Sequence, residues 1–403
     1  MKILFADSLP EEFVDQLRSR GDECEVRGDL TADDLPGAIG GVDVLVVRST
    51  GVTADTIAGS DRLGLIVRSG AGTNTIDCKA AADAGIYVCN VPGTNSLAVA
   101  ELTMGLLLAI DRHIADATAD LRNGIWNKQA YSRSDGIFGR TLGIIGVGAI
   151  GMAVAERARS FGLTVIAERK PDRTPETEAR IRAAGVKLID GLDGLLRESD
   201  IVSIHVPGGT STAGLVDTDF LDRMKPGAIL LNTSRGEMVD EAALIAAMDA
   251  KGIRAGLDVF CNEPGSDTAE FTSALAQHPN VVGTHHIGAS TQQAQDATAS
   301  GSIDVIEAYR AGDLLNCVNV SPTRIGTATI TIRHFDRVGV LASALEVLRA
   351  AAINVQTMEN RVFQGSNSAI GIIDVSGKIT EELVRKLAGL EHVIQVQASE
   401  RDA

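Results

Sequence analysis

The stretch TLGIIGVGAIGMAVAERARSFG, residues 141–162, decides the fold of this chain. Its first five residues are apolar enough for a buried strand, and the residues after the glycines have the composition of a helix that ends at Gly162. Between them, GVGAIG has the spacing GxGxxG, which alone says little in a chain of 403 residues with 42 glycines. At a strand-to-helix turn, however, Gly146 permits a tight turn, Gly148 lets the backbone approach a pyrophosphate, and Gly151 lets helix and strand pack closely. The stretch therefore predicts a dinucleotide-binding site, with a purely structural glycine turn as the alternative.

The strand that follows this helix, TVIAERK at residues 164–170, ends in charged residues. An acidic side chain at this strand end binds the ribose hydroxyls of NAD in many Rossmann folds. Glu168 favours NAD because it would repel a 2′-phosphate, whereas Arg169 with Lys170 would clamp the 2′-phosphate of NADP. Each of the three could instead be a solvated surface charge. We expect NAD as the cofactor, with NADP left open, and we expect Ala149 and Ile150 to contact it beside the glycines.

Further strands surround this stretch, and together they predict an α/β fold. A doubly wound parallel sheet of six strands is expected from apolar runs at residues 141–146, 164–167, 201–206, 228–232, 256–260 and 281–284. The first hundred residues also read as βα units with a parallel sheet. After the Pro- and Asn-containing segment 316–326, residues 327–403 give the order βαββαβ, which is typical of a ferredoxin-like module.

Composition and charge narrow the class of protein. Apolar residues make up 44% and charged residues 22%, which suits a soluble globular chain. A net charge of −16 disfavours electrostatic binding to nucleic acids or anionic membranes. The most apolar segments, 97–110 and 142–155, are shorter than the ~18 residues that a membrane span needs, and the N-terminus lacks the pattern of a secretion signal. Five cysteines without CxxC spacing or a nearby His favour reduced thiols in the cytoplasm and no metal site.

Three chemically useful residues follow three successive strands of the predicted six-stranded sheet. They are Arg235, Glu263 and His286. The carboxyl ends of parallel strands converge on a ligand crevice, so these side chains should meet over the nicotinamide. His286 could move the proton of a substrate hydroxyl, a carboxylate beside it would raise its pKa and fix its tautomer, and a guanidinium would grip a 2-oxo acid. The pattern predicts hydride transfer at a hydroxy acid, and it does not separate His286 from its neighbour His285.

At this point the sequence resembles a known family, the D-isomer-specific 2-hydroxyacid dehydrogenases. The resemblance covers essentially the whole chain and rests on VVRSTGVT (46–53), RSGAGTNTID (68–77), GTNSLAVAELT (93–103), LGIIGVGAIG (142–151), LLNTSRGEMVDEAAL (230–244), GLDVFCNEP (256–264) and THHIGAST (284–291). It implies that His286 is the acid/base, that Glu263 pairs with it, that Arg235 binds substrate and that Asp258 contacts the nicotinamide carboxamide. It also implies cofactor contacts at Pro207, Thr233 and Gly288. One departure stands out, because the usual family Asp falls on Arg169, with Glu168 one position early.

The resemblance also implies a domain plan. Residues 1–97 and 287–317 would form a discontinuous, flavodoxin-like substrate-binding domain, and 98–286 an NAD-binding Rossmann domain. Residues 318–326 would be a linker to an ACT regulatory domain over 327–403.

Within the family, the similarity is to the branch that oxidises 3-phosphoglycerate at the entry to L-serine biosynthesis. Such a substrate carries two anionic groups and needs more cations and donors than Arg235 alone. The candidates for binding it are Arg48, Ser49, Ala71, Gly72, Asn95 and Lys128. The alternatives are a glyoxylate or hydroxypyruvate reductase, which needs no phosphate site, and a dinucleotide-sensing protein without turnover.

The turn RHFDRVGVL, residues 333–341, resembles the ligand turn of serine-regulated ACT domains in this branch. The resemblance implies L-serine as an allosteric inhibitor, with contacts from His334, Asp336, Gly339 and Asn354. Asp336 stands where Asn is usual and Val338 where Pro is usual. The alternative is a dimerisation domain without a ligand, and in either case we expect a homodimer or homotetramer.

Overall fold

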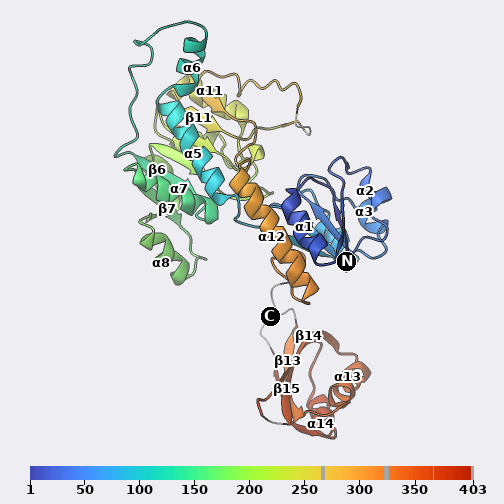
Figure 1. Ribbon diagram of the computed structural model, residues 1–403. Coiled ribbons are helices and arrows are strands. Elements are labelled where there is room, and N and C mark those ends of the chain that lie inside the picture. The colour runs from blue at the N-terminus through green and yellow to red at the C-terminus, as the bar shows by residue number, and fades with distance from the viewer. Residues whose placement is uncertain (265–267, 322–325, 366, 401–403) are drawn as a thin grey trace. The chain divides into compact units, whose positions relative to one another are not determined.

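Short apolar runs become the strands of three sheets, and the Ala-rich stretches between them become helices (Figure 1). The computed structural model describes residues 1–264, 268–321, 326–365 and 367–400. The chain divides into two compact units, Met1–Cys317 and Val318–Ala403. The predicted linker begins at this division, and its residues 322–325 lie outside the described part.

The first sheet is parallel, with the order β2-β1-β3-β4-β5 that flavodoxin-like folds share. Its central strands, VLVV and LIVR, are buried on both faces, as continuous apolar runs in parallel sheets are. The sheet and its connections comprise β1 (Lys2–Phe5), α1 (Glu11–Ser19), β2 (Glu23–Val26), α2 (Leu35–Ala38), β3 (Val44–Val47), α3 (Ala54–Ala58), β4 (Leu65–Arg68), α4 (Cys78–Asp83) and β5 (Tyr87–Asn90).

The second sheet is also parallel, with the order β12-β11-β10-β9-β6-β7-β8. The chain adds strands on one side of β6 up to β8 and then on the other side from β9 onward, so the strand order switches between β6 and β9. A Rossmann fold binds its ligand at such a switch point. The sheet and its connections comprise β6 (Thr141–Ile145), α7 (Ala149–Ser160), β7 (Thr164–Arg169), α8 (Pro175–Ala183), β8 (Lys187–Asp190), α9 (Gly191–Glu198), β9 (Ile201–Ile204), α10 (Thr218–Arg223), β10 (Ile229–Asn232), the 3₁₀ turn η1 (Gly236–Met238), α11 (Glu241–Lys251), β11 (Arg254–Leu257) and β12 (Val281–Gly283).

This sheet corrects the prediction of six strands, because β8 makes it seven. The strand KLID lies at the sheet edge, pairs only with β7, and exposes both of its end residues. A short edge strand with polar ends has no continuous apolar run, so the sequence pattern did not reveal it.

Long helices connect the elements of the first unit. The apolar helix α5 (Ser96–Asp111) packs on β10, β11 and β12 and is followed by α6 (Ile114–Arg122). The helix α12 (Gln292–Arg310) returns from the second sheet to pack on β4, β5 and α1, and it also contacts α5. The described residues contain no helix with the length and apolarity that a bilayer crossing would require.

The second unit holds an antiparallel sheet of order β14-β15-β13-β16. Its chain order is βαββαβ: β13 (Ala328–Phe335), α13 (Val340–Ala350), β14 (Asn354–Val362), β15 (Ser368–Ser376), α14 (Glu381–Ala388) and β16 (Val393–Glu400). The predicted fold class, two doubly wound parallel sheets followed by a βαββαβ module, is therefore confirmed.

Two glycines in helices give opposite predictions for the same substitution. A Cβ on Gly151 in α7 would lie 2.0 Å from the carbonyl oxygen of Gly146, so the backbone would have to move. A Cβ on Gly105 in α5 would meet nothing within 4 Å. We expect Gly151→Ala to lower the melting temperature and weaken NADH binding, and Gly105→Ala to stabilise the fold by about 0.5–1 kcal/mol. Thermal unfolding and NADH titration of both variants check this, and equal stabilities would contradict it.

Candidate functional site

The turn between β6 and α7 has the open backbone surface that a pyrophosphate needs. Gly146 adopts φ +97°, and a Cβ there would lie 2.4 Å from the carbonyl oxygen of His205. Gly148 caps α7 and has nothing within 4 Å of its Cβ position, so the backbone is approachable at that residue. Ala149 and Ile150 form the first turn of α7, whose amide end carries a partial positive charge. These residues fit a dinucleotide.

The strand end opposite this turn carries paired charges. Arg169 is the last residue of β7, and its Nε lies 3.4 Å from an Asp190 carboxylate oxygen. The Lys170 ammonium lies 3.9 Å from the Glu168 carboxylate. Both cations that could hold a 2′-phosphate therefore already face a carboxylate, which favours NAD over NADP at this strand end.

Two predicted cofactor residues follow neighbouring strands at the same sheet edge. Thr233 comes directly after β10, is buried, and shares a 3.1 Å hydrogen bond with the Thr103 hydroxyl of α5. Pro207 lies three residues after β9, and its carbonyl accepts a 2.8 Å hydrogen bond from the Thr212 hydroxyl. Pro207 thus lies beyond the carboxyl end of β9, one of the two strands at the switch point, and Thr233 lies beyond that of the adjacent strand β10.

His286 and Glu263 form a hydrogen-bonded pair at this edge. The Nδ1 atom of His286 lies 2.6 Å from one oxygen of Glu263, and the other oxygen accepts the Phe260 amide at 2.8 Å. The hydrogen bond that His286 donates to Glu263 raises the pKa of His286, outweighing burial. Burial acts to raise the pKa of Glu263, but the bonds from His286 and the Phe260 amide leave it lowered. Because Nδ1 faces Glu263, Nε2 is the ring nitrogen left for a substrate hydroxyl, and this geometry distinguishes His286 from His285.

Asp258 holds the loop that carries His286. Its carboxylate accepts hydrogen bonds from the Thr284 hydroxyl at 2.6 Å and from the Ile287 and Gly288 amides at 2.8 Å each. Its carbonyl accepts the His286 amide at 2.8 Å, and its side chain is buried. His286 adopts φ +54°, a left-handed conformation that non-glycine residues reach only where surrounding contacts impose it. Asp258 thus positions His286, whatever contact it also makes with the cofactor.

A close backbone approach brings Arg235 toward the same loop. A Cβ on Gly236 would lie 2.0 Å from the Phe260 carbonyl oxygen, so only glycine lets the two segments pack in this way. The Arg235 guanidinium donates to the Ser234 carbonyl at 2.7 Å, and its charge acts on both His286 and Glu263. The structure therefore brings the three predicted catalytic side chains into one electrostatic cluster.

Sequence reasoning missed Arg68, which joins this cluster from the end of β4. Burial, followed by the charges of Arg235 and Arg48, lowers the pKa of Arg68, so the Arg68 guanidinium is repelled by both of the others. The Nε atom of Arg68 is buried without a hydrogen-bond partner in the described structure, and its Nη1 donates to the Ser69 carbonyl at 2.9 Å. Such a site favours an anion with several acceptor oxygens. Its place at a strand end, inside the quoted motif RSGAGTNTID, was the signal that could have found it.

Asp7, also missed, organises the neighbouring loop. Its carboxylate accepts the amides of Arg48, Ser49 and Thr50 at 2.6, 3.1 and 3.2 Å, and the Ser49 hydroxyl at 2.6 Å. Burial acts to raise the pKa of Asp7, but these bonds outweigh it and leave the pKa lowered. The loop that carries Arg48 is therefore anchored by a charged carboxylate.

The remaining predicted substrate residues are placed differently. The Ala71 carbonyl accepts the Asn90 side-chain amide at 2.6 Å, and a Cβ on Gly72 would lie 3.1 Å from the Arg235 guanidinium, so this segment borders the cluster. Asn95 stands at the N-terminus of α5, and its side chain makes no capping bond there. Lys128 lies on the exposed segment after α6, and among the described residues no bond ties it to the cluster.

The four predicted regulatory residues lie around the first helix of the second unit. Gly339 caps α13 with φ +94°, and Asn354 begins β14. Asp336 is exposed, and its amide donates to the Asn367 carbonyl. His334 is buried, with one ring nitrogen 3.1 Å from the Asn360 side-chain oxygen and the other 2.8 Å from the Phe335 carbonyl.

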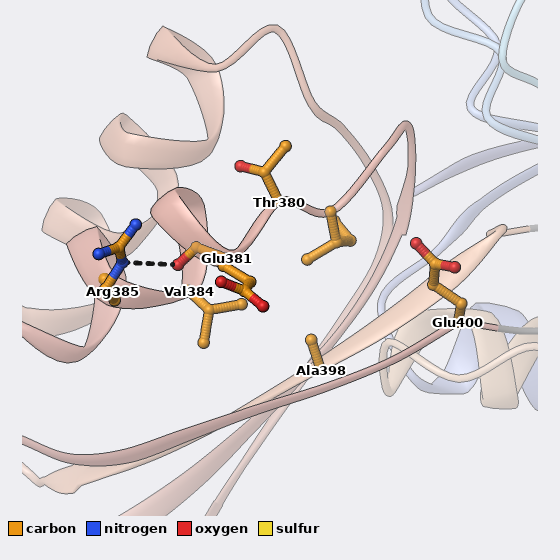
Figure 2. A pocket seen from close by; sticks show the side chains of 7 residues that line it. Thr380, Glu381, Val384, Arg385, Ala398 and Glu400 are labelled. Atoms are coloured by element: carbon orange, nitrogen blue, oxygen red, sulfur yellow. Dashed lines mark hydrogen bonds between the residues drawn. The ribbon is translucent and has the colours of Figure 1, made fainter.

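A separate hollow in the second unit lies between the start of α14 and the end of β16 (Figure 2). Its volume is about 520 Å³. It is lined by Ile379, Thr380, Glu381, Val384, Arg385, Ala398 and Glu400. None of the four predicted regulatory residues borders it, and the Arg385 guanidinium donates to the Glu381 carbonyl rather than standing free.

Comparison with known proteins gives the chain its family. Residues 104–288 match the family model described as D-isomer specific 2-hydroxyacid dehydrogenase, NAD binding domain. The D-3-phosphoglycerate dehydrogenase of Methanocaldococcus jannaschii is 39% identical over 332 residues, which is 81% of this chain and 61% of that protein. The hydroxypyruvate reductase of Thermotoga maritima is 44% identical over 292 residues, which is 72% of this chain and 92% of that protein.

A solved glyoxylate reductase from Paecilomyes thermophila superimposes with a TM-score of 0.70 and 26% identity, covering 79% of this chain and 98% of its own. The residues that match the family model include the glycine turn, Asp258 and the Glu263–His286 pair. The chain belongs to the D-isomer specific 2-hydroxyacid dehydrogenase family.

Proposed function

We propose that the protein oxidises 3-phosphoglycerate to 3-phosphohydroxypyruvate with NAD, the first step of L-serine biosynthesis. The observation that carries this proposal is the half-buried guanidinium of Arg68, on which the positive charges of Arg48 and Arg235 both act. A substrate with a carboxylate and a phosphate would relieve their repulsion, whereas a substrate with one carboxylate would leave two of them unpaired. The phosphoglycerate dehydrogenase relative from Methanocaldococcus supports the same substrate, although the chain spans only 61% of its length.

The side chains divide the reaction among them. NAD supplies the hydride acceptor when bound beside the glycine turn. Arg235 pairs with the substrate carboxylate and polarises the C2 oxygen, which fixes the orientation of the C2 hydrogen. Nε2 of His286 accepts the hydroxyl proton, and Glu263 stabilises the imidazolium that results. In this scheme Asp258 positions His286, Gly236 lets the Arg235 segment pack close to Phe260, and neither residue contacts the substrate.

A hydroxypyruvate reductase is the second candidate, favoured by the 44% identity to the Thermotoga relative. It would use the same groups in the reverse direction, with a protonated His286 donating to the carbonyl oxygen. Hydroxypyruvate has no phosphate for Arg68 to bind, and for this reason we place the hydroxypyruvate reductase second. A dinucleotide sensor without turnover would not need the hydrogen bond between His286 and Glu263.

We further propose the domain roles. The first sheet with α12, residues 1–97 and 287–317, would bind substrate, and residues 98–286 would bind NAD. The second unit would be an ACT domain that binds L-serine and helps to assemble a homodimer or homotetramer. Its sheet supports assembly, because β14 and β16 are edge strands, Phe335 and Val362 are exposed on it, and Phe363 is exposed directly after β14.

Substrate choice is tested by comparing 3-phosphoglycerate with glycerate. We expect far higher kcat/KM with 3-phosphoglycerate, and we expect Arg68→Met to lower that value by about tenfold or more while leaving glycerate turnover unchanged. Arg62→Met is the matched control, since Arg62 is exposed and its guanidinium pairs with Asp43 at 2.7 Å, away from the cluster. Equal rates with the two substrates in the unaltered protein would sink the assignment.

The acid/base assignment is tested by pH profiles. His286→Ala should lower kcat by ~10² to 10⁴, whereas His285→Ala should retain turnover. Because Glu263 raises the pKa of His286, Glu263→Gln should let His286 lose its proton at lower pH. Oxidation needs the unprotonated ring, so the acidic limb of kcat/KM should move to lower pH, and its plateau should fall as the base weakens. A profile unchanged in position and height would remove Glu263 from the mechanism.

Cofactor choice is tested by measuring kcat/KM with NAD and NADP. We expect NAD to be preferred because Arg169 and Lys170 are each paired with a carboxylate. Asp190→Asn should shift the ratio toward NADP by freeing Arg169, while Asp172→Asn, at an exposed position in the segment that follows β7, serves as the control. A strong preference for NADP in the unaltered protein would show that these cations bind the 2′-phosphate.

Regulation is tested by titrating L-serine against activity and melting temperature. We expect inhibition and a raised melting temperature, both lost in Asn354→Ala with basal turnover retained. Gln364→Ala, in the exposed β14–β15 hairpin, is the control that should respond as the unaltered protein does. Absence of both effects at millimolar serine would leave only a role in assembly.

A further inference from the structure

Two cysteines far apart in the sequence face each other at the edge of the first sheet. Cys89 lies in β5, and Cys317, the last residue of the first unit, pairs with it in an isolated antiparallel bridge. The Asn90 amide donates to the Asn316 carbonyl at 3.2 Å, one residue away from the pair on each strand. This pattern makes the cysteines a non-hydrogen-bonded pair, in which Cα atoms lie about 4.5 Å apart. Disulfides span Cα separations of about 4.4–6.8 Å, so the backbone is already at bonding distance.

The two thiols are in contact but differ in exposure. Cys89 is buried, and its side chain hydrogen-bonds to Cys317. Burial, together with that neighbour, raises the pKa of Cys89 to about 12, so it stays a thiol at neutral pH. Cys317 is only partly buried and borders the same apolar cluster as Cys89, beneath residues of α12. An oxidant from solvent therefore reaches Cys317 first, and the Cys89 sulfur lies in contact with the product. Because Cys89 is held as a neutral thiol, it must give up its proton as it reacts.

We propose that Cys89 and Cys317 are a redox-modification site that closes to a disulfide when the protein meets hydrogen peroxide. The Cys317 sulfur attacks one peroxide oxygen, the O–O bond breaks, and a sulfenic acid and one water form. The Cys89 sulfur then attacks the Cys317 sulfur, and the hydroxyl group leaves with the Cys89 proton as a second water. The two thiols lose two electrons in total, and the peroxide gains them. A dithiol reductant restores both thiols by exchange.

The Cys89–Cys317 disulfide would restrict the conformations that a large part of the unfolded chain can adopt. The ring that it closes contains residues 90–316 and thus the entire second sheet. The disulfide would hold the segment after α12 against β5, next to Asn90. The Asn90 side-chain amide donates to the carbonyl of Ala71, in the segment that borders the arginine cluster. A cross-link between residues already opposed in the native sheet leaves the folded strands in place, and it stabilises the protein mainly by restricting the unfolded chain.

Peptide mapping of the full-length protein tests the proposal directly. After peroxide treatment and alkylation without reductant, trypsin should give residues 80–112 joined to residues 311–324, each of which holds one cysteine. Dithiothreitol should separate the two peptides. The melting temperature of the oxidised protein should rise by roughly 5 °C and return on reduction. Both peptides alkylated singly, or Cys317 oxidised to a sulfinic acid while Cys89 is alkylated, would overturn the proposal.

Two variants locate the effect. Cys317→Ser should abolish the joined peptides and the thermal shift, while Cys78→Ser, which removes another partly buried thiol at the start of α4, should keep both. A shift that persists in Cys317→Ser would contradict the assignment. If that variant fails to fold, the peptide map of the unaltered protein still decides the question.

Discussion

The site depends on one buried carboxylate. Asp258, at the end of β11, accepts a hydroxyl and two amides through its side chain and a third amide through its carbonyl. These donors all belong to residues 284–288, which follow the neighbouring strand β12. Burying a carboxylate is costly unless hydrogen bonds satisfy it, so the loop and Asp258 stabilise each other. The strained backbone of His286 follows from this arrangement, and so does the alignment of its ring with Glu263.

Positive and negative groups near this carboxylate act in opposite directions on the pKa of His286. The whole chain carries a net charge of −16, yet Arg48, from the same sheet, and Arg235, from the second sheet, both place positive charge near Arg68. Glu263 stabilises positive charge on His286, while Arg235 opposes it. An anionic substrate would neutralise Arg235 and so strengthen the imidazole as a base when it is needed. Binding and proton transfer would thereby be coupled through a single guanidinium.

The sequence predicted much of this arrangement, for identifiable physical reasons. The glycine turn could be found because strand, turn and helix are adjacent in the chain, and their periodicities are local. Arg235, Glu263 and His286 could be grouped because parallel strands share a carboxyl edge. The family resemblance was confirmed, and it supplied Asp258, which local patterns would not have singled out.

Other features arise only from tertiary contacts. The edge strand β8 escaped notice because half of its residues are exposed and it has one neighbour. Arg68, the last residue of β4, and Asp7, two residues after β1, were missed because their importance lies in the groups that surround them rather than in their own sequence pattern. His285 and His286 could not be separated until the Nδ1 contact with Glu263 was seen. The opposition of Cys89 and Cys317, 228 residues apart, likewise has no local signature.

Hydrogen exchange at the loop after β12 tests the central claim, that the Asp258 carboxylate positions His286. The Ile287 and Gly288 amides should be protected in the unaltered protein, because each donates to that carboxylate. In Asp258→Asn, which replaces an acceptor oxygen by a donor, both amides should exchange about tenfold faster or more while β11 itself stays protected. Equal exchange of these amides in the two proteins would contradict the account, because it would show that the loop holds its shape without the carboxylate.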